Sequence, residues 1–233
     1  MTWILLIMMI WAGVHAKEYI SDYIVNPIVI DADLSEWNRA SVILLKDTTA
    51  KGDNQMKIRS LWDEQNLYLA YEVKNDDLQA NQTVLDHREL WLDDMIEFLI
   101  DPLNEKDSCW DENDLIYHIN LLGQKKDDRG SADCGTNPEW NGEAKYAVSL
   151  LGTLNDSTDT DNGYIIEISI SWAEIGLKPV EGLKLGADFA CGDKDGIRNS
   201  FFDWVGARPF RSPYAFGDLI LRRDENIIRD EKQ

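Results

Sequence analysis

Short stretches in which apolar and polar residues alternate make up most of the chain. The clearest runs from Tyr164 to Trp172, where every second residue is apolar. Strict alternation of this kind is typical of a β-strand with one buried face. Residues 95–101 repeat the pattern. It predicts a core between two sheets that includes Ile96, Phe98, Ile166, Ile168 and Ile170.

Segments with strand character follow one another along almost the whole sequence. Turn-forming residues such as Asn162-Gly163 separate them. Only residues 173–177 and the charged tail 224–233 have a helical pattern, and both are short. About ten short strands without a 3.6-residue repeat predict an all-β fold, an antiparallel β-sandwich. The predicted strands are 23–30, 41–46, 56–62, 67–74, 95–101, 115–122, 145–151, 164–172, 184–191 and 216–221.

The first 16 residues have the composition of a signal peptide. They carry an apolar run from Trp3 to Trp11, no acidic residue, lysine or arginine, and a small-x-small ending, Val14-His15-Ala16. We therefore expect residues 1–16 to be removed and the rest to be secreted, or periplasmic in a bacterium. No later apolar stretch approaches 18 residues, so no membrane insertion is expected. Without an internal Pro/Gly/Ser-rich linker, residues 17–223 are predicted to form one domain.

Charge narrows the range of partners. The chain has 23 basic and 43 acidic side chains and a formal net charge of −20. Nucleic acid and anionic lipid surfaces would be repelled by such a chain. Neutral glycans, cations and basic proteins remain possible.

Two of the three cysteines lie in loop-like sequence. Cys109 and Cys134 are surrounded by Asp and Gly residues, and we expect them to form a disulfide. Cys191 lies in an apolar strand, where a small buried thiol is the usual explanation.

The segment that leads into the strand 95–101 contains an aromatic and two acids, Trp91-Leu-Asp93-Asp94. A tryptophan placed before a strand can present the face of its ring. C–H groups of a sugar ring can lie on an indole while carboxylates accept hydrogen bonds from the hydroxyls. The alternative is that Trp91 caps the edge of the sandwich and the acids are solvated.

Five signatures occur in order along the chain. They read Val29-Ile-Asp31-Ala-Asp33-Leu-Ser-Glu36-Trp37, Ile58-Arg-Ser-Leu-Trp62-Asp63-Glu64-Gln-Asn-Leu67-Tyr68-Leu, Trp91-x-Asp-Asp94-x-Ile-Glu97-Phe-x-Ile-Asp101, Gly163-Tyr164-Ile-Ile-Glu167-Ile-Ser-Ile-Ser-Trp172 and Phe216-Gly217-Asp-Leu-Ile-Leu221. Together they resemble family 9 carbohydrate-binding modules. The resemblance covers nearly all of the chain after residue 16. It implies a jelly-roll-like sandwich of the kind shared with DOMON domains, which binds the ends of oligosaccharide or polysaccharide chains. It also implies a glycoside hydrolase as partner, a role in polysaccharide catabolism, and stabilising calcium.

The resemblance also assigns site residues. Trp91 matches the first of two tryptophans that clamp a terminal sugar in the family. Phe210, in Phe210-Arg211-Ser-Pro213, replaces the second, and His118 replaces a basic residue. Asp193 falls where the family has polar sugar contacts, although Asp193-Lys-Asp195-Gly196 is also an ordinary turn sequence. We expect Trp91 and Phe210 to face each other across a slot lined by His118, Asp193 and Arg211.

Two acidic segments are candidates for the calcium that the resemblance implies. Both supply carboxylate oxygens, which Ca²⁺ prefers, but neither has the spacing of a complete EF-hand. The candidate ligands are Asp107, Asp111, Asp114, Asp159 and Asp161.

Catalysis has little support in the sequence. No nucleophile-elbow sequence, phosphate-binding loop or Cys-x-x-Cys site is present. Glu97 belongs to a structural strand of the family. We therefore predict a module that is not an enzyme.

Two alternatives from other classes remain. A haem-binding cytochrome-like sandwich would use Met95 and His118 as ligands. A sugar-independent extracellular adhesion or scaffold domain would need neither. Of the remaining tryptophans, Trp110 and Trp140 either extend a sugar platform or pin loops. Three others, Trp37, Trp62 and Trp172, are expected to be packing residues.

Overall fold

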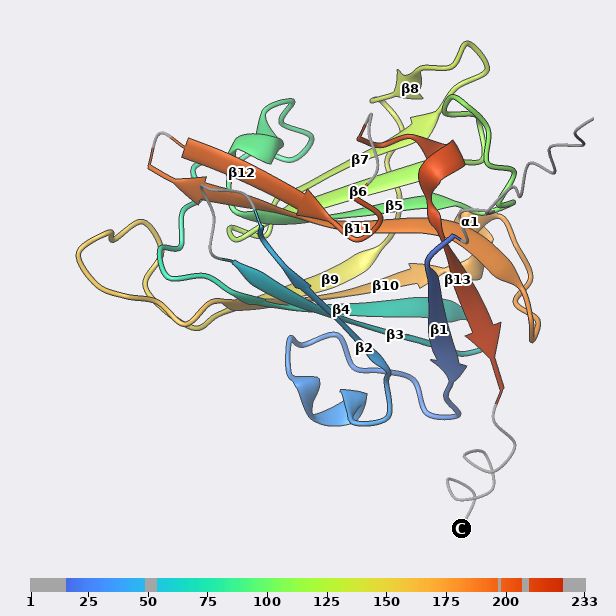
Figure 1. Ribbon diagram of the computed structural model, residues 1–233, viewed down its shortest axis with the longest axis horizontal. Coiled ribbons are helices and arrows are strands. Elements are labelled where there is room, and N and C mark those ends of the chain that lie inside the picture. Colours follow the sequence, from blue (N-terminus) through green and yellow to red (C-terminus); the bar gives the residue numbers. More distant parts are fainter. Residues whose placement is uncertain (1–15, 49–53, 197, 207–209, 224–233) are drawn as a thin grey trace, which may run out of the picture.

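The computed structural model describes residues 16–48, 54–196, 198–206 and 210–223. Most of the predicted signal peptide and all of the predicted helical tail lie outside these residues. The described chain forms a curled sheet of thirteen strands that folds into two facing layers (Figure 1). The predicted all-β sandwich is confirmed, with three strands more than expected.

The strands are β1 (Glu18–Tyr23), β2 (Val42–Lys46), β3 (Gln55–Trp62), β4 (Asn66–Lys74), β5 (Met95–Asp101), β6 (Leu115–Asn120), β7 (Lys125–Gly130), β8 (Thr136–Asn137), β9 (Lys145–Leu150), β10 (Tyr164–Ser171), β11 (Lys184–Asp195), β12 (Arg198–Asp203) and β13 (Gly217–Arg222). Helical turns are few. They are the 3₁₀ turns η1 (Leu34–Trp37), η2 (Leu90–Leu92) and η3 (Pro213–Ala215), and the α-helical turn α1 (Trp172–Ile175).

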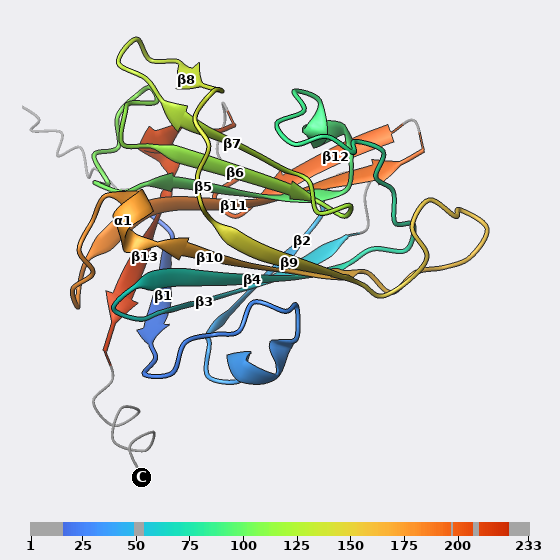
Figure 2. The same ribbon diagram turned by 180° about the vertical axis from the view of Figure 1, so that it is seen from behind.

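Each layer has its own run of paired strands, and the two runs join at one end of the molecule. One layer has the strand order β8-β7-β6-β5-β11, and β12 pairs with β11. The other layer has the order β3-β4-β10-β9, and β2 pairs with β3. Strands β13 and β1 connect β11 to β3 (Figure 2). Pairing is antiparallel except at β1, which runs parallel to both β13 and β3.

The core lies between the two layers, as the alternation predicts. All five residues expected there are fully buried, namely Ile96, Phe98, Ile166, Ile168 and Ile170. The packing roles of Trp37, Trp62 and Trp172 are also confirmed, since all three are buried.

Strand β5 departs from a simple alternation because both of its faces are covered. Its inward side chains enter the core. On its other face Leu99 packs with Ile116 and Phe216 in a separate small cluster that Trp110 covers. The segment that precedes β13 therefore lies over the outer face of this layer, beside Glu97.

Several strand predictions were wrong. The predicted strand 23–30 is mostly irregular, and β1 covers residues 18–23 instead. Strand β7, Lys-Lys-Asp-Asp-Arg-Gly, has no apolar alternation to reveal it. Its buried positions are filled by neighbouring ion pairs, Lys125 with Asp127 at 2.6 Å and Lys126 with Asp128. Strands β8 and β12 were also missed.

The signature residues near the N-terminus anchor a long irregular segment onto β10. The buried carboxylate of Glu167 accepts a hydrogen bond from the Trp37 indole at 2.7 Å and from the Ala32 amide at 2.8 Å. Asp63 closes the β3–β4 turn by accepting from the Asn66 amide at 2.7 Å and from the Tyr68 hydroxyl at 2.7 Å. These motifs specify the fold and not a binding site.

Candidate functional site

A cavity of about 300 Å³ lies beside the outer face of β5. Its lining residues come from four separate segments of the chain, and they are Trp91, Glu97, Phe201, Phe210 and Arg211. The structure thus brings Trp91, Phe210 and Arg211 into one cavity, as the resemblance led us to expect. Phe201 and Glu97 are lining residues that the sequence analysis did not assign to the site.

The aromatic walls differ in how they are held. Trp91 is the middle residue of η2, whose first residue, Leu90, is fully buried and anchors the turn. The Trp91 side chain remains 47% exposed. Phe201, on β12, meets Phe210 edge to face, with ring centroids 5.6 Å apart. One wall is therefore an open indole, and the other is a pair of mutually supported phenyl rings.

The polar side of the cavity is a cluster of three charged or polar groups. Glu97 on β5 and His118 on β6 are cross-strand partners, and His118 Nε2 lies 2.8 Å from Glu97 Oε1. The Arg211 guanidinium contacts both side chains. Burial by itself raises the pKa of Glu97, but the charges and hydrogen bonds of His118 and Arg211 outweigh it and lower that pKa below its ordinary value. Glu97 is therefore an ionised acceptor at neutral pH.

His118 takes part in this cluster without lining the cavity. The ring is only 2% exposed. Its Nδ1 lies 3.2 Å from the Lys126 carbonyl oxygen. Because a carbonyl can only accept, Nδ1 carries a proton. Nε2 lies against both the Glu97 carboxylate and the Arg211 guanidinium. His118 thus orients Arg211 and contacts a ligand only through it.

Asp193 is not brought to the cavity. It is 2% exposed and lies within hydrogen-bonding distance of Ser200, at 3.2 Å, and Asn75, at 3.4 Å. Strand β11 continues to Asp195 and pairs with β12, and Gly196 has a positive φ of 60°. Residues Asp193 to Asp195 thus end strand β11, and Gly196 lies in the turn that follows.

Asp93 and Asp94 are fully buried. Both interpretations of these acids, as acceptors for sugar hydroxyls and as solvated side chains, were therefore wrong. Asp93 accepts hydrogen bonds from the backbone N–H groups of Asn81, at 2.9 Å, and Gln82, at 2.8 Å. Asp94 accepts a hydrogen bond from the backbone N–H of Gln79 at 2.7 Å. The two carboxylates hold the preceding loop and thereby fix the position of η2.

The calcium candidates are not gathered into a site. Asp161 accepts the amides of Leu78, at 2.8 Å, and Thr153, at 2.7 Å, while Asp107 and Asp159 are exposed. Burial, with the nearby carboxylates, raises the pKa of Asp114 to about 7. Among the described residues, no group of three or more His, Cys, Asp or Glu side chains is arranged to hold a metal ion. Bound calcium therefore stays a prediction.

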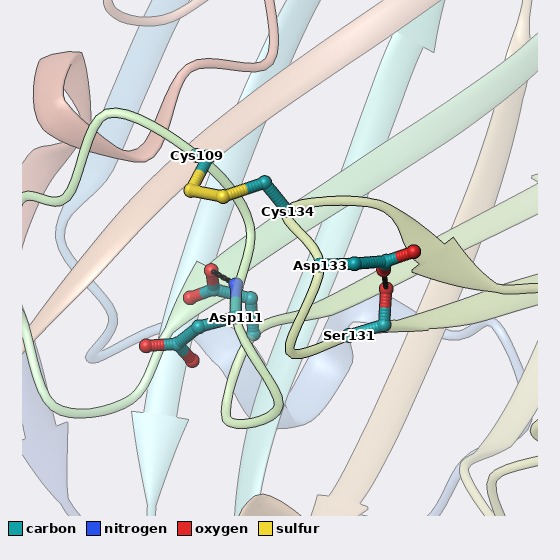
Figure 3. Close-up of a disulfide and its surroundings, with 6 residues drawn as sticks. Cys109, Asp111, Ser131, Asp133 and Cys134 are labelled. Carbon is teal, nitrogen blue, oxygen red and sulfur yellow. Dashed lines mark hydrogen bonds between the residues drawn. A yellow bond between two sulfur atoms is a disulfide. The ribbon is translucent and has the colours of Figure 1, made fainter.

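The cysteine predictions are confirmed. Cys109 and Cys134 form a disulfide with a Cα–Cα distance of 5.1 Å (Figure 3). Cys191 is a buried thiol, 3.4 Å from the Tyr164 hydroxyl.

The haem alternative has no support in the geometry. Met95 is fully buried, and both ring nitrogens of His118 are engaged by neighbouring groups. Neither side chain is presented to a space that could hold a haem.

The fold and the cavity together define a jelly-roll-like β-sandwich with an aromatic-walled cavity on the outer face of one layer. The chain belongs to the family described as carbohydrate family 9 binding domain-like, whose sequence model matches residues 30–224. No helix among the described residues is long and apolar enough to cross a membrane.

Curated relatives match this chain over only a small part of their own length. It is 27% identical over 201 residues to endo-1,4-beta-xylanase A of Thermotoga neapolitana, which covers 83% of this chain and 17% of the relative. The same enzyme of Thermotoga maritima is 28% identical over 202 residues, again covering 83% and 17%. The chain therefore spans about a sixth of these relatives.

Solved structures share the fold. A carbohydrate-binding module of family 9 from Caldicellulosiruptor kristjanssonii, in complex with cellotriose, is 21% identical with a TM-score of 0.70, over 90% of this chain and 96% of that one. A putative carbohydrate-binding protein from Bacteroides uniformis is 16% identical with a TM-score of 0.69, over 89% and 100%.

Proposed function

We propose that the cavity binds a terminal sugar of a β-linked glucan or xylan chain, and that the protein is a non-catalytic module. The observation that carries the proposal is the composition of the cavity. Trp91 offers an open indole face, Phe201 and Phe210 supply an apolar wall, and Glu97 and Arg211 offer an acceptor and donors for hydroxyl groups. An apolar cavity with a few converging polar groups is the usual form of a small-ligand site.

The proposed ligand class draws on the relatives. One structural relative is described with cellotriose and another with glucose, and the curated relatives are xylanases. A cavity of about 300 Å³ lies at the small end of known ligand sites, which suits one or two sugar units better than the middle of a long chain.

We further propose export and service to polysaccharide degradation, with a glycoside hydrolase as partner. The apolar segment 3–11 and the site after Ala16 support export. The occurrence of the matching region within xylanases supports the partnership.

Calorimetric titration with glucose, cellotriose and xylotriose tests the proposed site. Replacing Trp91 by Ala should weaken binding about tenfold to hundredfold, because one aromatic stacking platform contributes about 1–3 kcal/mol. Phe210→Trp should tighten binding by restoring the larger ring. Leu151→Ala, at an exposed position between β9 and β10, is the control and should bind like the parent.

Two outcomes would contradict the proposal. If the parent binds none of the three sugars, this cavity has another ligand or none. If the parent binds but the affinity of the Trp91 variant is unchanged, the sugar is held elsewhere on the molecule.

A further inference from the structure

Phe210 and Arg211 are sequence neighbours whose side chains both line the cavity. Adjacent side chains of an extended chain point to opposite sides, so this arrangement requires a bend. Arg211 supplies it with a φ of 62°, in the left-handed region that is uncommon for residues other than glycine. As a result the guanidinium lies over the Phe210 ring, 5.8 Å from its centroid.

The bend is held from outside the cavity by Trp110. Its indole N–H donates a hydrogen bond of 2.8 Å to the Arg211 carbonyl oxygen. This bond fixes the peptide plane that follows Arg211. The Trp110 ring also packs edge to face on the buried Phe216, with centroids 5.8 Å apart, so the indole itself has a defined position.

The segment that carries Trp110 is fastened at several points. Cys109, the preceding residue, is bonded to Cys134 in the loop after β7 (Figure 3). Lys106 donates to the Phe216 carbonyl oxygen at 2.5 Å. The hydrogen bond therefore holds this segment against the chain that leads into β13, and the disulfide ties it to the loop after β7.

We propose that Trp110 is a positioning residue for the binding cavity, and that the Cys109–Cys134 bridge keeps it in place. Without the indole N–H, the left-handed bend at Arg211 relaxes, the guanidinium withdraws from Glu97 and His118, and Phe210 no longer keeps its place in the wall. The effect on sugar affinity rests on the proposed function, whereas the effect on Arg211 does not.

The test uses Trp110→Phe, which keeps a ring against Phe216 and removes only the donor. Trp140→Phe is the matched control, because that half-buried loop tryptophan packs on Tyr117 and Arg129 instead. We expect Trp110→Phe to weaken cellotriose binding about fivefold, which corresponds to the loss of one hydrogen bond. Trp140→Phe should bind like the parent. Thermal midpoints report whether both variants fold.

A second measurement needs no sugar. In ¹H–¹⁵N spectra of the imidazole, Arg211→Ala should shift the His118 ring resonances, because it removes the guanidinium that contacts Nε2. Trp110→Phe should shift them in the same direction, and Trp140→Phe should leave them in place. If Trp110→Phe does not fold, the Cys109→Ser/Cys134→Ser variant replaces it and should give the same direction of shift.

The two measurements separate the two proposals. If the parent binds no sugar but His118 responds to Trp110→Phe as predicted, the proposed function fails and the positioning role stands. Unchanged His118 resonances in Trp110→Phe would overturn the positioning role, even if affinity fell, because the loss would not pass through Arg211.

Discussion

At the scale of single residues, the buried acids of this protein have distinct tasks. Glu97 is ionised by its partners at the cavity, whereas Asp93 and Asp94 hold a loop through backbone amides. Asp188 on β11 also accepts from backbone amides, but its pKa is raised. It accepts amides from Phe189, at 2.9 Å, and Val205, at 3.1 Å, and is 1% exposed.

Asp188 should make stability depend on pH. Burial, together with the nearby Asp203, raises the pKa of Asp188 to about 8 from an ordinary 3.8. The folded state therefore keeps this proton over a range where the unfolded chain has lost it. The stabilisation is complete below pH 3.8 and is lost as pH rises toward 8.

The Asp188→Asn variant tests this directly. It should be more stable than the parent at pH 9, by on the order of a few kcal/mol, and about equal to it near pH 4. Urea unfolding at both pH values is the measurement, with Glu181→Gln as an exposed control. A difference between Asp188→Asn and the parent that is the same at both pH values would contradict the assignment.

At the scale of elements, the success of sequence reasoning depended on what fills each strand. Strand β5 was predicted with its observed bounds because Ile96, Phe98 and Ile100 alternate along it. Strand β7 was missed because ion pairs replace apolar residues there. For the cavity, Trp91 and Arg211 could be found from family motifs, but Phe201 could not, because only the pairing of β12 with β11 places it beside Phe210.

The entry into β10, in the layer that contains β3, β4 and β9, should be sensitive to substitution. Gly163 has a φ of +119°, and a Cβ there would lie 1.9 Å from the Val73 carbonyl oxygen. Gly163→Ala should therefore cost about 2–4 kcal/mol of stability, since the edge of β4 must move. Gly123 also has a positive φ, +68°, but a Cβ added there would have nothing within 4 Å. Gly123→Ala is therefore the comparison.

Gly123→Ala should accordingly cost about 1–2 kcal/mol, the price of a left-handed alanine alone. Chemical unfolding of both variants separates the clash from the backbone term. Equal losses would mean that the Val73 contact relaxes freely.

At the scale of the whole molecule, two elements that contribute residues to the cavity lie apart from the first and last strands. Strands β1 and β13, which begin and end the described chain, lie at one end of the sandwich, and β12 and η2 lie at the other (Figure 1).

The net charge of −20 should make the stability of the whole fold depend on salt. Repulsion among the excess acids favours expansion of the chain, and its range falls from about 30 Å at 0.01 M salt to about 10 Å at 0.1 M. We expect the thermal midpoint to rise as NaCl is added over this range.

Calcium chloride at matched ionic strength, with magnesium chloride as control, tests the loop calcium that the family resemblance implies. A larger rise with calcium than with either other salt, reversed by EDTA, would confirm specific binding. If the thermal midpoint rises equally in all three salts, calcium acts only by screening charge. If it rises in none of them, repulsion among the acids does not limit the stability of this fold.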